Sequence, residues 1–169
     1  STVEDPTAGW YEGFIGPGKA LDTTIFRIIC PSNLGAPFGS TSPLSKKPSS
    51  NEIWGKDFPQ ITPCDMARAV HALLTRGCGI NGLHGVVGGS LGGNLTLSFV
   101  SLYPEFAKCA VAMCCTGRTS PLSVGLRHIQ RSAIQADPMF HGGDYHKMGT
   151  FPKSGLSIAR QLAMLVYKS

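Results

Sequence analysis

The sequence predicts an α/β protein with a parallel sheet, on three observations. Short apolar runs at residues 83–87 and 109–115 alternate with longer segments whose apolar residues recur at helical spacing. The second run is apolar throughout, as expected for a strand that helices cover on both faces. A G-x-S-x-G motif at residues 88–92 lies between the first run and the next helical segment. Alternation of this kind favours parallel strands joined by right-handed crossovers.

The composition is that of one folded domain. The chain has 169 residues, of which 42% are hydrophobic and 15% charged, so it can bury a sizeable core. Its formal net charge is only +5, and no basic stripe carries interleaved aromatic residues, which argues against a nucleic-acid partner. No apolar run approaches the roughly 18 residues that span a bilayer. No leader is visible at the N-terminus, so we expect no membrane partner and a cytoplasmic location.

The six cysteines are predicted to be free thiols. None has the C-x-x-C spacing of a zinc or redox site, and most lie inside apolar runs, where a free cysteine acts as a small hydrophobic residue. This usage favours a reducing compartment. We therefore predict no disulfide framework, no metal site and no bound cofactor.

The first third of the chain is predicted to contain little regular structure. Residues 1–22 are rich in glycine and proline, which favours a loop. Residues 26–30 include an aromatic residue and two β-branched isoleucines and are predicted to be a strand. Residues 31–59 show no periodicity, and an irregular stretch of this length inside a compact domain is more often functional than not.

A helix is predicted to begin at Pro63. Thr62 can cap it, proline suits its first position, and Asp65 can complete the cap three residues on. The apolar stripe that follows has helical spacing and consists of Met66, Ala69, Val70, Leu73 and Leu74. His71 then falls on the polar side of this helix. The glycines at residues 77–79 end it.

The rest of the chain continues the alternation of strand and helix. The strand at residues 83–87 leads through the glycine-rich turn into a helix over residues 91–102, which a Tyr-Pro pair ends. A strand over residues 109–115 comes next. Two further helices are predicted over about residues 122–136 and 155–167.

Ser90 is the candidate nucleophile. The serine of a G-x-S-x-G motif lies on a sharp strand-to-helix turn that exposes its hydroxyl above the sheet. Gly88 and Gly92 are expected to be required, because a β-carbon on either would collide with the adjoining backbone. The backbone N–H of Leu91 would be one donor to a developing oxyanion. The alternative is a glycine-rich turn whose serine only caps the following helix.

A series of further motifs runs along the chain. They occupy residues 16–23, 33–35, 39–41, 57–59, 88–93, 130–134, 137–138, 142–145, 155–156 and 159–160, and Tyr167. In this order they resemble the homoserine O-acetyltransferases, acyltransferases of the α/β-hydrolase fold whose relatives include deacetylcephalosporin C acetyltransferase. Leu91 stands where the family usually has methionine, which is tolerable because the role belongs to the backbone. Residues 94–99 also depart from the family pattern.

The resemblance implies the α/β-hydrolase fold, with a parallel-sheet core and helices on both faces. Residues 1–169 would form part of that domain, and residues from about 120 onward would lead into the family's helical lid. In this family the catalytic acid and histidine follow the serine on later strands. We therefore expect this chain to be an incomplete fragment without them, inactive by itself. The resemblance also implies a homodimer for the full-length protein.

The resemblance further implies a ping-pong acyl transfer in methionine biosynthesis. Ser90 would take the acetyl group of acetyl-CoA, release CoA, and pass the acetyl group to the hydroxyl of homoserine. Arg160 and Tyr167 match the family's substrate-binding residues. Their spacing brings both side chains to one helix face about 10 Å apart, where a guanidinium can take a carboxylate in a two-pronged hydrogen bond.

Other functions remain open at this point. The acceptor can be serine or deacetylcephalosporin C instead of homoserine, and the donor can carry a succinyl group. An esterase using the same serine would pass the acyl group to water. Taken without the resemblance, Arg160 would be an exposed helix charge and Tyr167 a core aromatic residue.

Overall fold

The computed structural model describes residues 11–167, and the chain divides into two compact units, Ser1–Ser32 and Asn33–Ser169. The first unit contains turns and one isolated parallel bridge between Ile15 and Leu21. The loop predicted over residues 1–22 is therefore observed from residue 11, and its first ten residues lie outside the described part. The prediction of a strand over residues 26–30 is wrong: these residues have no regular secondary structure. The described part of this unit, residues 11–32, contains no strand with which they could pair.

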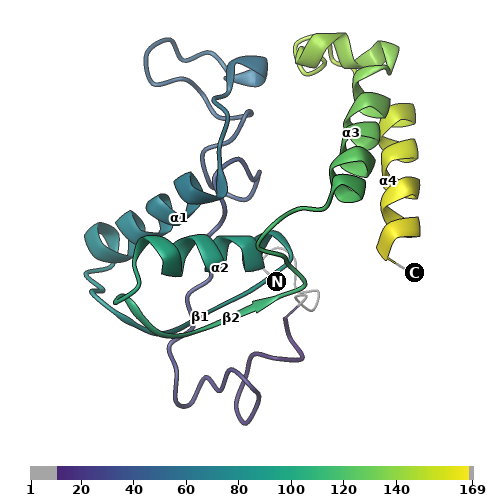
Figure 1. Ribbon diagram of the computed structural model, residues 1–169. Helices are drawn as coiled ribbons and strands as arrows, with labels where there is room; N and C mark the ends of the chain where they lie inside the picture. Colours follow the sequence, from purple (N-terminus) through teal and green to yellow (C-terminus); the bar gives the residue numbers. More distant parts are fainter. Residues whose placement is uncertain (1–10, 168–169) are drawn as a thin grey trace. The chain divides into compact units, whose positions relative to one another are not determined.

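The second unit holds all the described helices and paired strands (Figure 1). In chain order they are the 3₁₀ helix η1 (Gly55–Asp57), α1 (Pro63–Ala72), the π-helical turn η2 (Leu73–Gly77), β1 (Leu83–Gly89), α2 (Leu91–Leu102), β2 (Ala107–Met113), α3 (Pro121–Gln135), the 3₁₀ segment η3 (Pro138–Gly143) and α4 (Lys153–Tyr167). The long irregular stretch before α1 is confirmed, apart from η1 and one antiparallel bridge between Lys46 and Ile53.

The predicted start of α1 is confirmed in detail. The Asp65 N–H donates to the Thr62 hydroxyl at 3.2 Å, and the Thr62 N–H donates to the Asp65 carboxylate at 3.0 Å. The Thr62 hydroxyl also donates to the Asp65 carboxylate at 2.6 Å. This bond first, and then the bond from the Thr62 N–H, holds the pKa of Asp65 below its usual value. The helix widens into η2 after Ala72 and ends at Gly77, so the predicted end is also correct.

β1 and β2 form a parallel pair, and α2 connects them and packs on both (Figure 1). Their register pairs Leu83 with Ala107 and Gly89 with Met113. The second strand therefore lies two residues earlier than predicted. It ends at Met113 because Cys114 has φ 52°, in the left-handed region, and a residue in that conformation cannot continue an extended strand.

The expected cover on both faces of β2 is not seen in the described part of the chain. Among the described helices, α2 packs on the strands and α1 packs on α2. Val111, in the middle of β2, is 47% exposed. The apolar sequence of β2 thus predicted a strand of a parallel sheet correctly, while the burial that it also predicted is not observed among residues 11–167.

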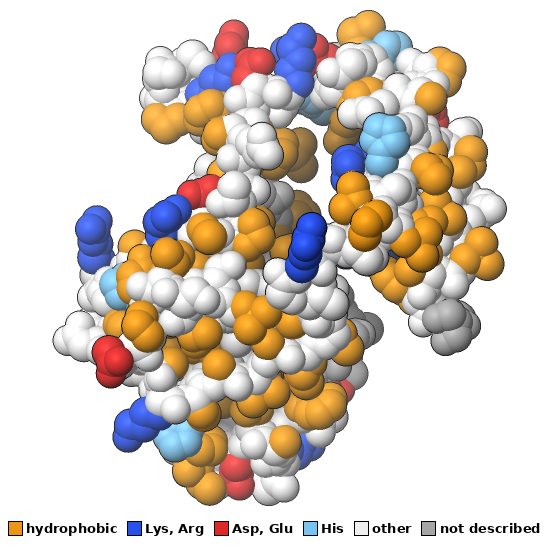
Figure 2. Space-filling view, viewed as in Figure 1, with side chains coloured by type: hydrophobic (Ala, Val, Ile, Leu, Met, Phe, Trp, Pro, Cys, Tyr) orange, Lys and Arg blue, Asp and Glu red, His pale blue; other side chains and the backbone are white. Residues whose placement is uncertain are grey.

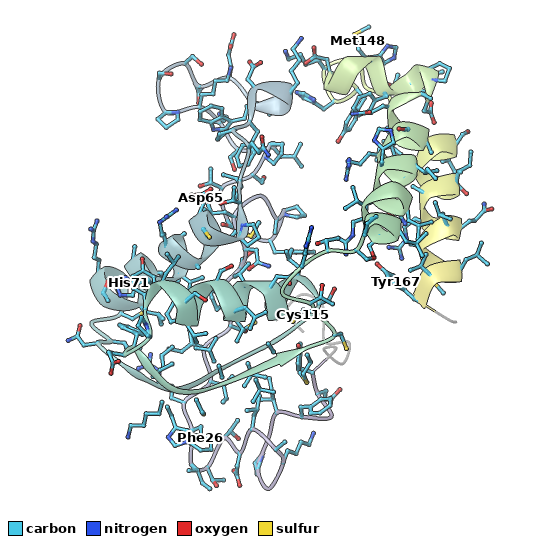
Figure 3. All side chains as sticks on the ribbon, viewed as in Figure 1. Phe26, Asp65, His71, Cys115, Met148 and Tyr167 are labelled. Carbon is cyan, nitrogen blue, oxygen red and sulfur yellow. The ribbon has the colours of Figure 1, made fainter. Side chains whose placement is uncertain are left out.

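His71 lies in an aromatic cluster that joins α1 to α2, so its predicted place on the polar side of α1 is wrong. Its ring stacks on Tyr103 with centroids 3.8 Å apart and planes 7° apart. Phe106 meets the same ring edge-on at 4.8 Å. His71 is half-buried at the end of α1 that meets the C-terminal end of α2 (Figure 3). The position of a partner helix, which periodicity does not reveal, decides the environment of this residue.

α3 and α4 form an antiparallel hairpin (Figure 1). Their backbones approach closely at Gly155, where an added β-carbon would lie 2.3 Å from the carbonyl oxygen of Ala133. The buried carboxylate of Asp137 accepts hydrogen bonds from the N–H groups of Gly155 at 2.8 Å and Met139 at 2.9 Å. Asp137 thus ties the start of α4 to η3. Among residues 11–167, no helix has the length and apolar character needed to cross a membrane.

Replacing Asp137 with asparagine is expected to lower the melting temperature by about 5 °C at pH 7. Asparagine has no negative charge, and its amide NH₂ group would place a hydrogen-bond donor against one of the two backbone N–H groups that donate to Asp137. The two backbone hydrogen bonds, from Gly155 first and then Met139, lower the pKa of Asp137 in the folded state. A carboxyl group whose pKa is lower in the folded state than in the unfolded state stabilises the fold at pH values above its unfolded-state pKa. This stabilisation is lost as the pH falls through its folded-state pKa.

Thermal unfolding monitored by circular dichroism between pH 3 and pH 7 checks this prediction. The difference in melting temperature between the wild type and Asp137→Asn should stay constant near neutral pH. It should become smaller only below the ordinary carboxyl pKa of about 3.9. Glu105→Gln, at an exposed carboxylate between α2 and β2, is the matched control and should not shift the melting temperature. Equal melting temperatures for the wild type and Asp137→Asn at pH 7 would contradict the assigned role.

Candidate active site at the turn after β1

Ser90 occupies a strained turn between β1 and α2. Its backbone has φ 57° and ψ −115°, a conformation that costs a non-glycine residue on the order of 1–3 kcal/mol. Two hydrogen bonds hold it there: its own N–H donates to the carbonyl of Met113 at 2.9 Å, and the Asn94 N–H donates to the carbonyl of Ser90 at 3.1 Å. The end of β2 and the first turn of α2 therefore fix the position of this residue.

The Ser90 side chain does not cap α2. It makes no capping hydrogen bond, so the alternative of a serine that serves only as a helix cap is wrong. Ser90 is exposed, and no residue among 11–167 forms a hydrogen bond with its hydroxyl. Leu91 is the first residue of α2, and its N–H is one of the donors that a helix start leaves without an intrahelical acceptor. A free hydroxyl thus stands beside free backbone donors at the positive end of a helix.

Two glycines, Gly88 and Gly93, make the turn possible, and only Gly88 is one of the two that the motif indicates. A β-carbon on Gly88 would lie 2.2 Å from the carbonyl oxygen of Gly92. A β-carbon on Gly93 would lie 2.7 Å from both the Cys115 sulfur and the Met113 carbonyl oxygen. Gly92 itself has no atom within 4 Å of its β-carbon position. Gly88 is therefore required as predicted, whereas Gly92 is not, and sequence analysis missed Gly93.

No acidic or basic side chain among residues 11–167 is hydrogen-bonded to the Ser90 hydroxyl. His128 lies on α3, within 3.5 Å of the Ser132 hydroxyl, and His141 and His146 lie in η3 and just after it. No group of histidine, cysteine, aspartate or glutamate side chains among residues 11–167 is arranged to hold a metal ion. A cavity of about 740 Å³ at the start of α3 is lined by residues 118–121, 124, 125 and 128, and Ser90 is not among its walls.

Arg160 and Tyr167 both lie on α4, and both are exposed. Tyr167 is 76% exposed at the last turn of that helix (Figure 3). It is therefore not a core aromatic residue in the described part of the structure. The guanidinium of Arg160 forms no ion pair with any described residue. α4 packs on α3, while α2 packs on the strands and α1. Ser90 and Arg160 therefore belong to different packing groups, and the structure does not bring them into contact.

A family model described as alpha/beta hydrolase fold matches residues 7–167 of the chain. The chain belongs to this family. Its strand, strained serine turn and helix are the arrangement in which this fold carries a nucleophile.

Known proteins similar to this α/β-hydrolase chain include acyltransferases. Homoserine O-acetyltransferase of Moorella thermoacetica is 41% identical over 162 residues, which cover 95% of this chain and 42% of the relative. Serine O-succinyltransferase of Litchfieldella anticariensis is 39% identical over 169 residues, which cover 100% of this chain and 46% of the relative. The chain thus spans less than half the length of these curated relatives.

Similar solved structures include a transferase and an esterase. Homoserine O-acetyltransferase from Bacillus anthracis superimposes with a TM-score of 0.84 and 32% identity, covering 97% of this chain and 45% of that one. The crystal structure of esterase E22 gives a TM-score of 0.82 and 29% identity, covering 96% of this chain and 45% of that one. Both chemistries are therefore found on closely similar backbones, and the fold alone does not choose between them.

Proposed function

We propose that this protein is an acyl-CoA-dependent O-acyltransferase that moves an acetyl group from acetyl-CoA to L-homoserine, in methionine biosynthesis. The observation that carries the proposal is Ser90, held at φ 57° with its hydroxyl exposed and not used as a helix cap. A serine kept in a strained conformation with a free hydroxyl fits a nucleophile better than a structural residue. The names of the curated relatives support the choice of an acyltransferase over other reactions of the fold.

The reaction has two half-reactions. The Ser90 oxygen attacks the thioester carbonyl, the C–S bond breaks, CoA leaves as a thiol, and Ser90 carries an acetyl ester. The homoserine hydroxyl then attacks that ester, which frees Ser90 and yields O-acetylhomoserine. The Leu91 N–H would donate to the oxyanion formed in each step. The base that moves the protons would lie outside residues 11–167, and for that reason we propose that the 169-residue chain is inactive by itself.

Arg160 and Tyr167 would bind the amino-acid substrate. Arg160 has a guanidinium free of protein partners among the described residues, and such a group can hold the homoserine carboxylate with two parallel hydrogen bonds. Tyr167 lies on the same helix and is exposed, so its hydroxyl can add a further bond. A simple esterase has no need for such a carboxylate site, which favours the transferase. No bound cofactor is proposed; acetyl-CoA is a substrate.

Mass spectrometry after incubation with acetyl-CoA tests the proposal. It uses the native protein in which this chain is present together with the residues that supply the base. One added acetyl group should appear on the peptide that contains Ser90, and L-homoserine should remove it faster than water does. Parallel incubations with L-serine as acceptor and succinyl-CoA as donor separate the acyltransferases from one another. Absence of the acyl group would contradict the proposal, because covalent transfer requires it.

Hydrolysis is the second candidate function, favoured by the similarity to esterase E22. It requires the same acyl-Ser90 intermediate but uses water as the acceptor. Equal loss of the acetyl group with and without homoserine in the experiment above would select it.

We also propose a homodimer and a cytoplasmic location. The hydrophobic side chains visible on the α3–α4 hairpin (Figure 2) support a partner surface there. The exposed hydrophobic residues of these two helices include Leu122, Val124, Ile129, Ile158 and Leu165, all at least half exposed. All six cysteines are free, which fits a reducing compartment.

A further inference from the structure

Two short elements that are far apart in the sequence, η1 and η3, interlock through paired glycines and side chains. Gly55 in η1 has φ 53°, and a β-carbon there would lie 2.8 Å from the His146 ring. Gly143 at the end of η3 has φ 99°, and a β-carbon there would lie 3.3 Å from the β-carbon of Lys56. The side chain missing at Gly143 makes room for Lys56 of η1, and the one missing at Gly55 makes room for His146, three residues after the end of η3. We call these four residues, together with Asp144, the η1–η3 junction.

The junction is also held by charge. The Lys56 amine lies 3.2 Å from one carboxylate oxygen of Asp144, and the Lys147 amine lies 3.2 Å from the other. These two lysines, Lys147 first, hold the pKa of Asp144 below its usual value. The Asp144 side chain is 25% exposed, so this three-charge group is less screened than an isolated surface pair. Lys56 is thus the residue of η1 that both packs on η3 and pairs with Asp144, which directly follows η3.

η3 is in turn fixed to the start of α4. Asp137 at its N-terminal side accepts the hydrogen bond from the Gly155 N–H. The Thr150 hydroxyl donates to the carbonyl of Met139 at 3.1 Å, which closes the segment between η3 and α4. Arg160 follows Gly155 by five residues on the same helix, and an α-helix transmits a displacement along its axis with little loss over that length. A continuous set of contacts therefore runs from Lys56 to the helix that carries Arg160.

We propose that Lys56 and Asp144 are positioning residues for the carboxylate-binding guanidinium of Arg160. The inference rests on the proposed function. The η1–η3 junction sets where η3 lies, η3 sets where α4 begins, and α4 sets where Arg160 presents its two N–H donors. Bidentate binding of a carboxylate tolerates little displacement, and a misplacement of about 1 Å can cost up to about 100-fold in rate. Ser90 is in the other packing group, so its acetylation does not depend on the junction.

The test measures the two half-reactions separately in the native protein. Lys56→Gln should raise the KM for L-homoserine by about ten-fold, while the rate of Ser90 acetylation by acetyl-CoA stays within about two-fold of the wild type. Lys56→Arg keeps the charge and the packing stem and should restore most of the affinity. Asp144→Asn should reproduce the effect of Lys56→Gln from the other side of the junction.

Two reference variants complete the design. Lys108→Gln, at an exposed lysine of β2 without an ion pair among the described residues, should change neither half-reaction. Arg160→Ala should show the same pattern as Lys56→Gln with a larger rise in KM. An unchanged KM in Lys56→Gln, or an equal loss in both half-reactions, would overturn the inference and leave the proposed function intact. Failure of the wild type to transfer acetyl to homoserine would overturn both.

Discussion

Replacement of Ser90 by alanine is expected to abolish acetyl transfer while leaving the fold intact. Removing the nucleophile of a covalent mechanism lowers turnover on the order of 10⁴-fold or more. The fold should be unaffected, because the Ser90 side chain makes no capping hydrogen bond and the backbone bonds to Met113 and Asn94 do not involve it. We therefore expect the free energy of unfolding to change by less than about 0.5 kcal/mol.

Steady-state kinetics and urea denaturation of the same preparation measure these two effects. Ser101→Ala, at an exposed serine in the last turns of α2, is the matched control and should keep full activity. Retention of acetyl transfer in Ser90→Ala would show that another residue carries the acyl group. A large loss of stability would show that the serine serves the fold after all.

Gly88→Ala is expected to destabilise the protein by about 3 kcal/mol or more. The new β-carbon would overlap the Gly92 carbonyl oxygen at 2.2 Å and approach the Thr96 hydroxyl at 2.7 Å. Thr96 is 2% exposed, and the Gly92 carbonyl belongs to the backbone of α2, so neither group can move unless α2 shifts away from β1. That shift would also displace Ser90, and acetyl transfer should fall with stability.

Gly92→Ala is the matched control, and its expected effect has the opposite sign. No atom lies within 4 Å of its β-carbon position, and Gly92 is inside α2, where alanine is favoured over glycine by up to about 1 kcal/mol. Urea denaturation of the two variants should therefore give changes of opposite sign. Equal destabilisation would mean that the motif, and not the local contact, determines which glycine matters.

Features that depend on neighbours in the sequence were predicted well. The capping pair of Thr62 and Asp65 lies within one turn, and the serine turn lies within five residues, so both are encoded locally. The predicted strand at residues 26–30, the burial of β2 and the polar environment of His71 each depend on a distant partner. Hydrophobic pattern indicates that a face needs a partner but does not say which element supplies it.

The candidate site divides in the same way. Ser90 and Leu91 followed from one short motif, while Arg160 and Tyr167 were found only through resemblance to a family. Asp137 and Asp144 were overlooked as structural residues although both lie in segments used for that resemblance. Their roles depend on hydrogen bonds and ion pairs to Gly155 and Lys56, and single-sequence patterns carry no signal for such distant contacts.

The close approach at Gly88 separates two kinds of selection on this turn. Glycine is imposed there by the carbonyl of Gly92, whether or not the protein catalyses anything. Ser90 contributes no capping hydrogen bond to the fold, so under the proposed function its hydroxyl is needed for the reaction alone. A variant that no longer catalyses the reaction can therefore exchange the serine at little cost in stability, but it must keep the glycine for as long as the strand and the helix meet. Replacement of the serine alone would thus indicate a lost reaction, and replacement of the glycine a changed contact between the strand and the helix.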